Sequence, residues 1–102
     1  NDLVSSTALG AAGCHMILFS TGRGTPFGTF VPTIKVSTNS DLYRRKERWI
    51  DFNAGSLLEG VAMEELLRDF LRKVIDIASG ERTKSEENGF KQIAIWKDGV
   101  TL

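Results

Sequence analysis

The strongest constraint on the fold is an apolar stripe between residues 61 and 79. Apolar side chains recur there at spacings of three and four, which places them on one face of an α-helix. They are Met63, Leu66, Leu67, Phe70, Leu71, Val74, Ile75 and Ala78. Glu64 and Arg68 form an acid-first pair on the remaining face, and Gly80 suits the end of a helix. We expect a long helix whose apolar stripe belongs to the core and is not a cofactor-binding face.

Two short segments before this helix have the pattern of β-strands. Residues 16–19 are a compact apolar run, and residues 33–38 alternate between two faces. Helices are expected over 2–12 and from about 39–41 to a residue between 46 and 48. Capping-box spacing predicts a helical turn at Ser56 with Glu59 and a short helix at Thr83 with Glu86. A strand is expected over 92–96, and Asp98 with Gly99 indicates a hairpin turn after it. Strands interleaved with helices predict the α/β class. We expect one small domain over residues 1–102, with a few-stranded sheet, a long covering helix and a C-terminal hairpin.

The segment most informative about function is the glycine-rich stretch at residues 21–28, TGRGTPFG. It follows an apolar strand, which is where α/β proteins place ligand sites. Its glycines let backbone N–H groups approach an anion closely, and Arg23 offers a planar guanidinium suited to a carboxylate. The alternative is a solvent-exposed turn whose glycines serve only the path of the backbone. The spacing does not fit a dinucleotide-binding fingerprint, because Pro26 lies where a helix must begin, and no Gly-Lys-Ser/Thr ending marks a phosphate loop.

Few other residues have the character of a catalytic or metal-binding group. His15, the single histidine, is a candidate acid or base, although a lone histidine before a buried strand is more often structural. Cys14, the single cysteine, is expected to be a small buried apolar residue. No spacing of histidines, cysteines or carboxylates suits a metal, so a metal site needs ligands from outside this chain.

The distribution of charge favours a small anion over nucleic acid as a ligand. Thirteen basic residues balance thirteen acidic ones, whereas nucleic-acid binders carry a basic excess. Residues 20–48 hold six basic and two acidic side chains, and the mixed basic and aromatic stretch at 43–49 is interpreted as a solvated helix face. The single cysteine fits a reducing compartment, so we expect a cytoplasmic protein. No apolar run is long enough to span a bilayer, and the missing initial methionine indicates a piece of something longer.

Five strings of the sequence are similar to the C-terminal region of the altronate and galactarate dehydratases. They are NDLVS at 1–5, FSTGRGTPFG at 19–28, VPTIKV at 31–36, WIDFNAG at 49–55 and KDGVTL at 97–102. The resemblance covers nearly the whole chain, and the TGRGTPFG string is long and unusual. Sulfolactate sulfo-lyases resemble the same family, so the substrate stays open between altronate, galactarate and a related acid.

The resemblance implies a metal-dependent hydro-lyase that converts a sugar acid to a 2-keto-3-deoxy acid, with iron(II) as the metal. Its implied catalytic residue is Arg23, which stabilises the substrate anion, and His15 is a weak second candidate without a place in the family's motif. The implied substrate-binding residues are Thr21, Gly22, Arg23, Gly24, Thr25 and Gly28, with hydroxyls supplied by Thr21 and Thr25. The base and most metal ligands are expected in the N-terminal remainder of the enzyme, so the isolated chain is predicted to be inactive.

Two other classes of function remain open. The first is a separate non-catalytic module that binds a small anion, which the glycine-rich loop and the local basic excess also support. The second is a structural or oligomerisation domain whose site lies elsewhere. An exposed apolar face on the helix at 61–79 together with a disordered loop would favour the second. The oligomeric state is not determined by the sequence.

Overall fold

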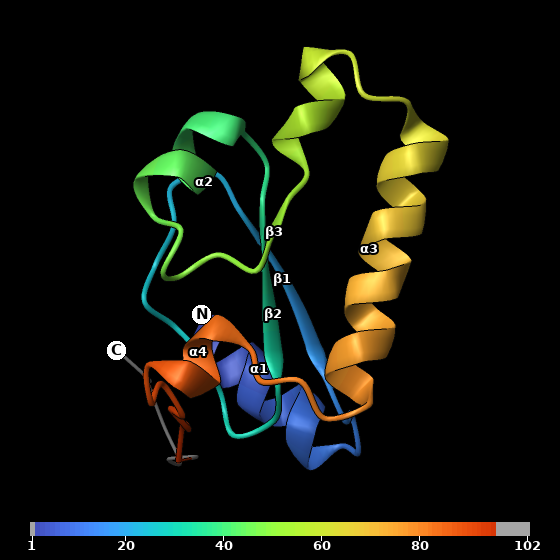
Figure 1. The fold of residues 1–102 in the computed structure, drawn as a ribbon. Helices are drawn as coiled ribbons and strands as arrows, with labels where there is room; N and C mark the ends of the chain where they lie inside the picture. The colour runs from blue at the N-terminus through green and yellow to red at the C-terminus, as the bar shows by residue number, and fades with distance from the viewer. Residues whose placement is uncertain (1, 96–102) are drawn as a thin grey trace.

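Three short parallel strands form the centre of the molecule. A computed structural model describes residues 2–95, and in it β1 (Ile17–Thr21), β2 (Thr33–Ser37) and β3 (Phe52–Asn53) pair in the order β1-β2-β3. Ile17 pairs with Thr33 and Val36 with Phe52, which fixes the register of the sheet. Figure 1 shows α1 (Asp2–Ala11) and α4 (Lys84–Glu87) at the end where β1 and β2 begin, and α2 (Ser40–Arg45) and η1 (Gly55–Glu59) at the opposite end. The predicted α/β class is confirmed.

The two faces of the sheet are covered by different parts of the chain. Lys35 lies on one face of β2, and the loop between β1 and β2 folds over that face. The Phe27 ring of the loop lies 5.4 Å from the Phe19 ring of β1. There Ser85 of α4 donates its hydroxyl to the Phe27 carbonyl at 2.8 Å. The opposite face packs on α3 (Met63–Ala78), and the rings of Phe52 and Phe70 lie 5.1 Å apart. The buried apolar residues are Ile17, Phe27, Ile34, Leu42, Ile50 and Ile77.

The ends of the short helices follow the sequence closely, with one exception. Thr83 and Glu86 form both hydrogen bonds of a capping box at the start of α4, as predicted. Ser56 does not open a helix in the same way, because η1 already begins at Gly55. A Cβ at Gly55 would lie 2.3 Å from the backbone nitrogen of Ser40, so the chain turns there through a contact that only glycine allows.

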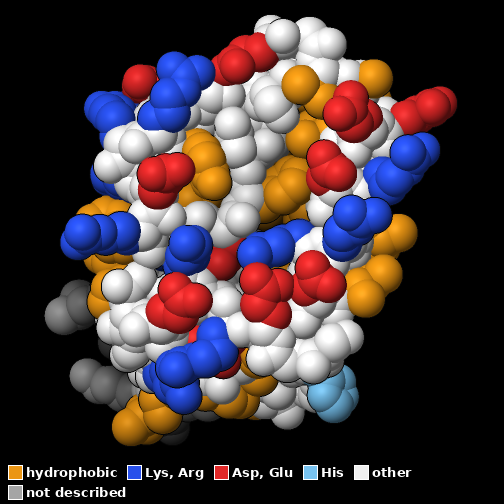
Figure 2. Space-filling view, viewed as in Figure 1, with side chains coloured by type: hydrophobic (Ala, Val, Ile, Leu, Met, Phe, Trp, Pro, Cys, Tyr) orange, Lys and Arg blue, Asp and Glu red, His pale blue; other side chains and the backbone are white. Residues whose placement is uncertain are grey.

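The prediction that the whole apolar stripe of α3 is core is wrong. Ile77 is the single buried residue of this helix. Met63, Leu67, Leu71 and Ile75 are 59%, 60%, 56% and 55% exposed. The apolar face is wider than the small sheet it packs on, since β3 has only two residues. Figure 2 shows hydrophobic side chains gathered over α3 along the right edge of the view.

The C-terminal part of the described chain also differs from the prediction. Residues 92–95 form no strand; Gln92 makes an isolated parallel bridge with Thr29. The main-chain nitrogen of Ala94 donates to the Thr7 hydroxyl of α1 at 2.9 Å. The hairpin predicted at Asp98 and Gly99 lies outside the described residues. Cys14 is exposed and not buried, because the chain turns at the surface between α1 and β1.

Candidate functional site

The glycine-rich loop begins at the carboxyl end of β1, on a polar edge of the sheet. The register aligns Thr21 with Ser37, and Ser37 with Asn53, so each strand ends in a polar residue. Ligands of open parallel sheets bind outside the carboxyl ends of the strands. The loop therefore starts where this class of fold places its sites.

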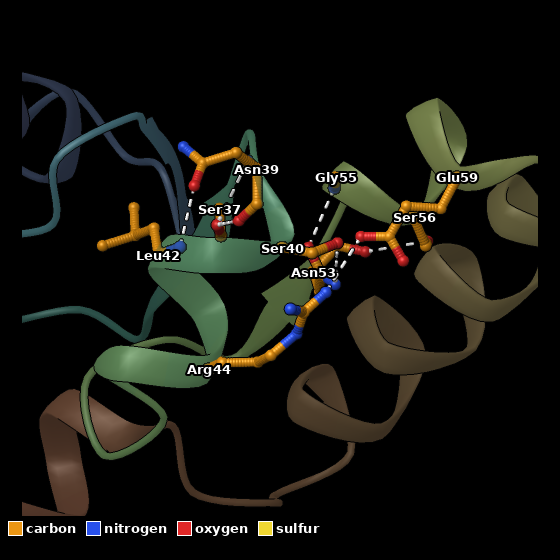
Figure 3. A network of polar contacts seen from close by, with 9 residues as sticks. All are labelled: Ser37, Asn39, Ser40, Leu42, Arg44, Asn53, Gly55, Ser56 and Glu59. Atoms are coloured by element: carbon orange, nitrogen blue, oxygen red, sulfur yellow. Dashed lines mark hydrogen bonds and ion pairs between the residues drawn. The ribbon is translucent and has the colours of Figure 1, made fainter.

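Polar side chains fix the segments that follow the neighbouring strands at this edge (Figure 3). Asn39 caps α2 by accepting a hydrogen bond from the Leu42 amide at 2.7 Å, and the Ser37 hydroxyl donates to the Asn39 carbonyl. Asn53 donates to the Ser40 hydroxyl at 3.0 Å and accepts from the Gly55 amide at 2.9 Å. The sequence alone did not predict this network, although Asn39 at the expected start of a helix is a residue type that caps helices.

The first part of the loop is fastened to its own start and to α2. The Gly24 amide donates to the Thr21 hydroxyl at 2.9 Å, and the Asn39 side chain donates to the Gly22 carbonyl at 3.1 Å. Gly24 has φ +79, and a Cβ there would lie 2.8 Å from a methyl group of Leu42. The backbone conformation disfavours a side chain at this position, and the Leu42 side chain of α2 would have to shift to make room for one.

Two lysine side chains donate hydrogen bonds to main-chain carbonyls of the loop, those of Arg23 and Thr25. The Lys46 ammonium donates to the Arg23 carbonyl at 3.1 Å. The Lys35 ammonium, on the central strand, donates to the Thr25 carbonyl. Lys35 is fully buried. In the sequence Lys35 belongs only to the local basic excess, and its face of the strand, shared with Thr33 and Ser37, has the polar character of a solvent-facing side, so the pattern gave no sign of its burial.

A half-buried carboxylate, that of Asp51, joins the central strand to α4. It accepts hydrogen bonds from the backbone amides of Lys35 and Lys84, both at 2.8 Å. Burial lowers the pKa of Lys35 to about 8. The negative charge of Asp51 raises this pKa in part, and the positive charge of Lys46 lowers it further. Burial also raises the pKa of Asp51, against the effect of its two backbone hydrogen bonds. The Lys35 ammonium thus fastens the loop to the central strand, while the Asp51 carboxylate fastens that strand to α4.

Arg23 is the exposed cationic side chain of the loop. Within residues 2–95 its guanidinium makes no hydrogen bond or ion pair, and the amides of Gly22 and Thr25 also donate to no described group. The Gly24 amide differs, since it is already bonded to Thr21. The backbone around Arg23 is therefore fixed while its side chain and two neighbouring amides are available to a ligand.

Gly28 and His15 lie in different surroundings. Gly28 is buried, and a Cβ there would lie 2.5 Å from the Phe90 carbonyl oxygen and 2.6 Å from the Ser85 side chain, so its contacts are packing contacts. His15 is exposed and lies before the start of β1, whereas Arg23 lies after the end of β1. Five strand residues span roughly 16 Å, so the fold does not bring His15 to the loop.

The described residues do not form a metal site on their own. Between positions 2 and 95, no group of three or more His, Cys, Asp or Glu side chains is placed to hold a metal ion. No helix in that part of the chain is long and apolar enough to cross a membrane.

The stretch at 43–49 is a solvated helix face and the turn after it, as predicted. Arg44 pairs with Glu59 at 3.2 Å and Arg45 with Asp41 at 3.0 Å, with all four side chains largely exposed. Residues 44–49 line an open surface hollow of about 550 Å³.

Fold and loop together define a small α/β domain that presents an arginine on a fixed glycine-rich loop at the carboxyl edge of a parallel sheet. Residues 1–101 match the family model described as D-galactarate/altronate dehydratase, C-terminal, so the chain belongs to this family. It is 55% identical to the altronate dehydratase of Escherichia coli (strain K12) over 102 residues and 59% identical to that of Bacillus subtilis (strain 168) over 103 residues. Both alignments cover 100% of this chain and 21% of the relative. The galactarate dehydratase (L-threo-forming) of Escherichia coli is 36% identical over 100 residues, which are 94% of this chain and 19% of that protein. The chain thus spans about a fifth of the length of these relatives.

Proposed function

We propose that this domain supplies the substrate-anion loop of a hydro-lyase that dehydrates altronate to a 2-keto-3-deoxy acid. The two relatives named altronate dehydratase are 55% and 59% identical to the chain, against 36% for the galactarate enzyme, which favours altronate over galactarate. The enzyme as a whole includes the sequence that the relatives carry outside this fifth of their length.

One observation carries the proposal: the backbone of the loop is fixed, while the Arg23 guanidinium bonds to no group within residues 2–95. Side chains of Thr21, Asn39, Lys46 and Lys35 hold the loop's main chain at four successive residues. A donor that is held in place before the substrate arrives needs little reorganisation during the reaction. A bidentate guanidinium fits a carboxylate, the group that all sugar acids share.

The chemistry of dehydration explains why such a donor is useful. Removal of the proton beside the carboxylate gives an enediolate, whose extra negative charge lies on the carboxylate oxygens. Arg23 would bind that carboxylate in the ground state and more strongly as the charge grows, and the amides of Gly22 and Thr25 would add donors. The Thr25 hydroxyl is suited to a hydroxyl of the substrate, whereas the Thr21 hydroxyl already accepts from Gly24.

The proposal includes a divalent metal, iron(II), held by the rest of the enzyme. The described residues lack a suitable group of ligands, so no step of the reaction is assigned here to the metal. The general base is likewise proposed to lie outside this chain, because His15 lies beyond the far end of β1.

Arg23→Lys and Arg23→Ala in the full-length enzyme test the proposal. Lysine keeps the charge but loses the bidentate fork, so we expect kcat to fall and KM to rise with the melting temperature unchanged. For alanine we expect a loss of roughly 10²–10³-fold in kcat, the usual effect of removing one oxyanion donor. Arg48→Ala is the matched control, because Arg48 is also exposed and lies in the turn after α2.

Two results would contradict the proposal. Wild-type kcat/KM in a well-folded Arg23→Ala enzyme would remove Arg23 from the site. A rise in KM with unchanged kcat would favour the alternative of a non-catalytic anion-binding module.

A structural role is a second candidate, and the exposed apolar side of α3 favours it. It is compatible with the first, since the loop and α3 are separate surfaces.

A further inference from the structure

Helix α3 has two apolar sides, and the sheet covers only one of them. Leu66, Phe70 and Ile77 lie on the side facing the sheet, and Ile77 is the most enclosed of the three. The second side is a ridge of residues spaced by four, Met63, Leu67, Leu71 and Ile75, each more than half exposed. Charged residues such as Arg68, Arg72 and Asp76 occupy the rest of the helix surface. A helix that met water on this side would carry polar residues there.

The ridge borders an apolar hollow between α3 and the sheet. The hollow has a volume of about 200 Å³ and is lined by Val36, Phe52, Ala54, Met63, Leu66, Leu67 and Phe70. Met63 and Leu67 belong to both the hollow and the ridge, so the two form one continuous apolar surface. Figure 2 shows hydrophobic side chains both in the depression beside α3 and at its outer edge. A ridge beside a hollow is suited to a partner surface that inserts an apolar side chain of its own.

We infer that the α3 ridge and its hollow are the docking surface for the part of the dehydratase chain that lies outside residues 1–102. The relatives carry this domain on 21% of their length, so about four fifths of each chain is available to cover the surface. The inference rests on family membership and on the exposure of α3, and does not depend on the role of Arg23.

The size of the surface favours a segment of the same chain over a second copy. Met63 to Ile75 covers about 18 Å of helix axis at the α-helical rise. The ridge and hollow comprise nine residues, whereas a stable dimer interface takes roughly 20–30 residues from each partner. A covalently linked segment docks at an effective concentration of about millimolar, so a smaller surface suffices.

Thiol labelling of the full-length enzyme tests the inference. Cys14 is exposed and is first changed to serine, to remove a competing thiol. Leu71→Cys then places a thiol on the ridge, and Arg72→Cys places one on the adjacent polar side of the same helix. The extent of maleimide labelling is followed over time on the peptide that contains α3, by mass spectrometry. We expect Leu71→Cys to react at least about tenfold more slowly than Arg72→Cys.

The other outcomes overturn the inference. Equal labelling rates at the two positions would show that the ridge is open to solvent in the whole enzyme. Protection of Leu71→Cys that disappears when the enzyme is diluted to monomers would assign the ridge to a second copy. If Leu71→Cys fails to fold, Met63→Cys tests the same ridge at the N-terminal end of α3 against the same control.

Discussion

The half-buried carboxylate of Asp51 is the group whose removal should disturb the domain most for the smallest change in size. Its two oxygens accept from the amides of Lys35 and Lys84, each at 2.8 Å, and so connect the central strand to α4. Asparagine has the same shape but one acceptor oxygen. Asp51→Asn therefore retains one of these bonds and turns the other into a contact between two donors.

The magnitude follows from the two amides. A buried donor left without a partner costs roughly 1–3 kcal/mol. We expect Asp51→Asn to lose about 1–3 kcal/mol of unfolding free energy and Asp51→Ala to lose about 2–5 kcal/mol. Part of the loss in Asp51→Ala is offset, because burial already disfavours the charged form of the carboxylate. In a domain of this size, 1 kcal/mol lowers the melting temperature by roughly 4–8 °C.

Urea denaturation of purified residues 1–102, followed by tryptophan fluorescence, measures these losses. Asp41→Asn is the matched control, because Asp41 is exposed and pairs only with Arg45 on the surface of α2. We expect that control to change the stability by less than about 0.5 kcal/mol. Asp51 variants that fall within the same narrow range would refute the role assigned to the half-buried carboxylate.

Three further predictions concern the core, the pH dependence and the isolated domain. Phe70→Ala should lower the free energy of unfolding by about 2–3 kcal/mol, less than the roughly 3–5 kcal/mol expected for a fully buried ring, because Phe70 is only partly buried. A loss under about 1 kcal/mol in urea denaturation would contradict the packing of Phe70 on Phe52. The folded-state pKa of Lys35 is about 8 against an ordinary value of 10.5, so the unfolded chain binds more protons between these values and stability should rise with pH across that window. Comparison with Lys35→Met, which should lack this increment, isolates its contribution from that of the other lysines. Purified residues 1–102 should fold but produce no keto acid from altronate or galactarate with iron(II), and measurable turnover would overturn the assignment of base and metal ligands to the rest of the enzyme.

The sequence predicted those features that depend on neighbouring residues. Thr83 and Glu86 are three positions apart and form their capping box wherever the surrounding chain lies. The periodicity over 61–79 located α3 to within two residues at each end. The glycine-rich loop was also placed correctly after a strand, since glycine and proline interrupt regular structure locally.

Features that depend on distant partners could not be predicted in this way. The period of the α3 stripe shows which residues share a face, but the exposure of Leu71 depends on a sheet too small to cover that face. The hydrogen bond from the Lys35 amide to the Asp51 carboxylate joins residues 16 positions apart. The strand predicted over 92–96 is absent from residues 92–95 for the same reason, because Gln92 forms only an isolated bridge with Thr29 and a hydrogen bond to the Gly28 carbonyl.

The bridge between Thr29 and Gln92 has a consequence for how the domain is made. The Thr29 hydroxyl donates to the Gln92 carbonyl at 2.9 Å across 63 positions, and the Ala94 amide reaches Thr7 across 87. These contacts join the loop after Gly28 and the first helix to residues that are synthesised late within this domain. During translation the nascent chain therefore lacks the groups that complete both regions. Folding of this domain is completed only after synthesis of nearly all of its residues, and its loop is among the last parts to mature.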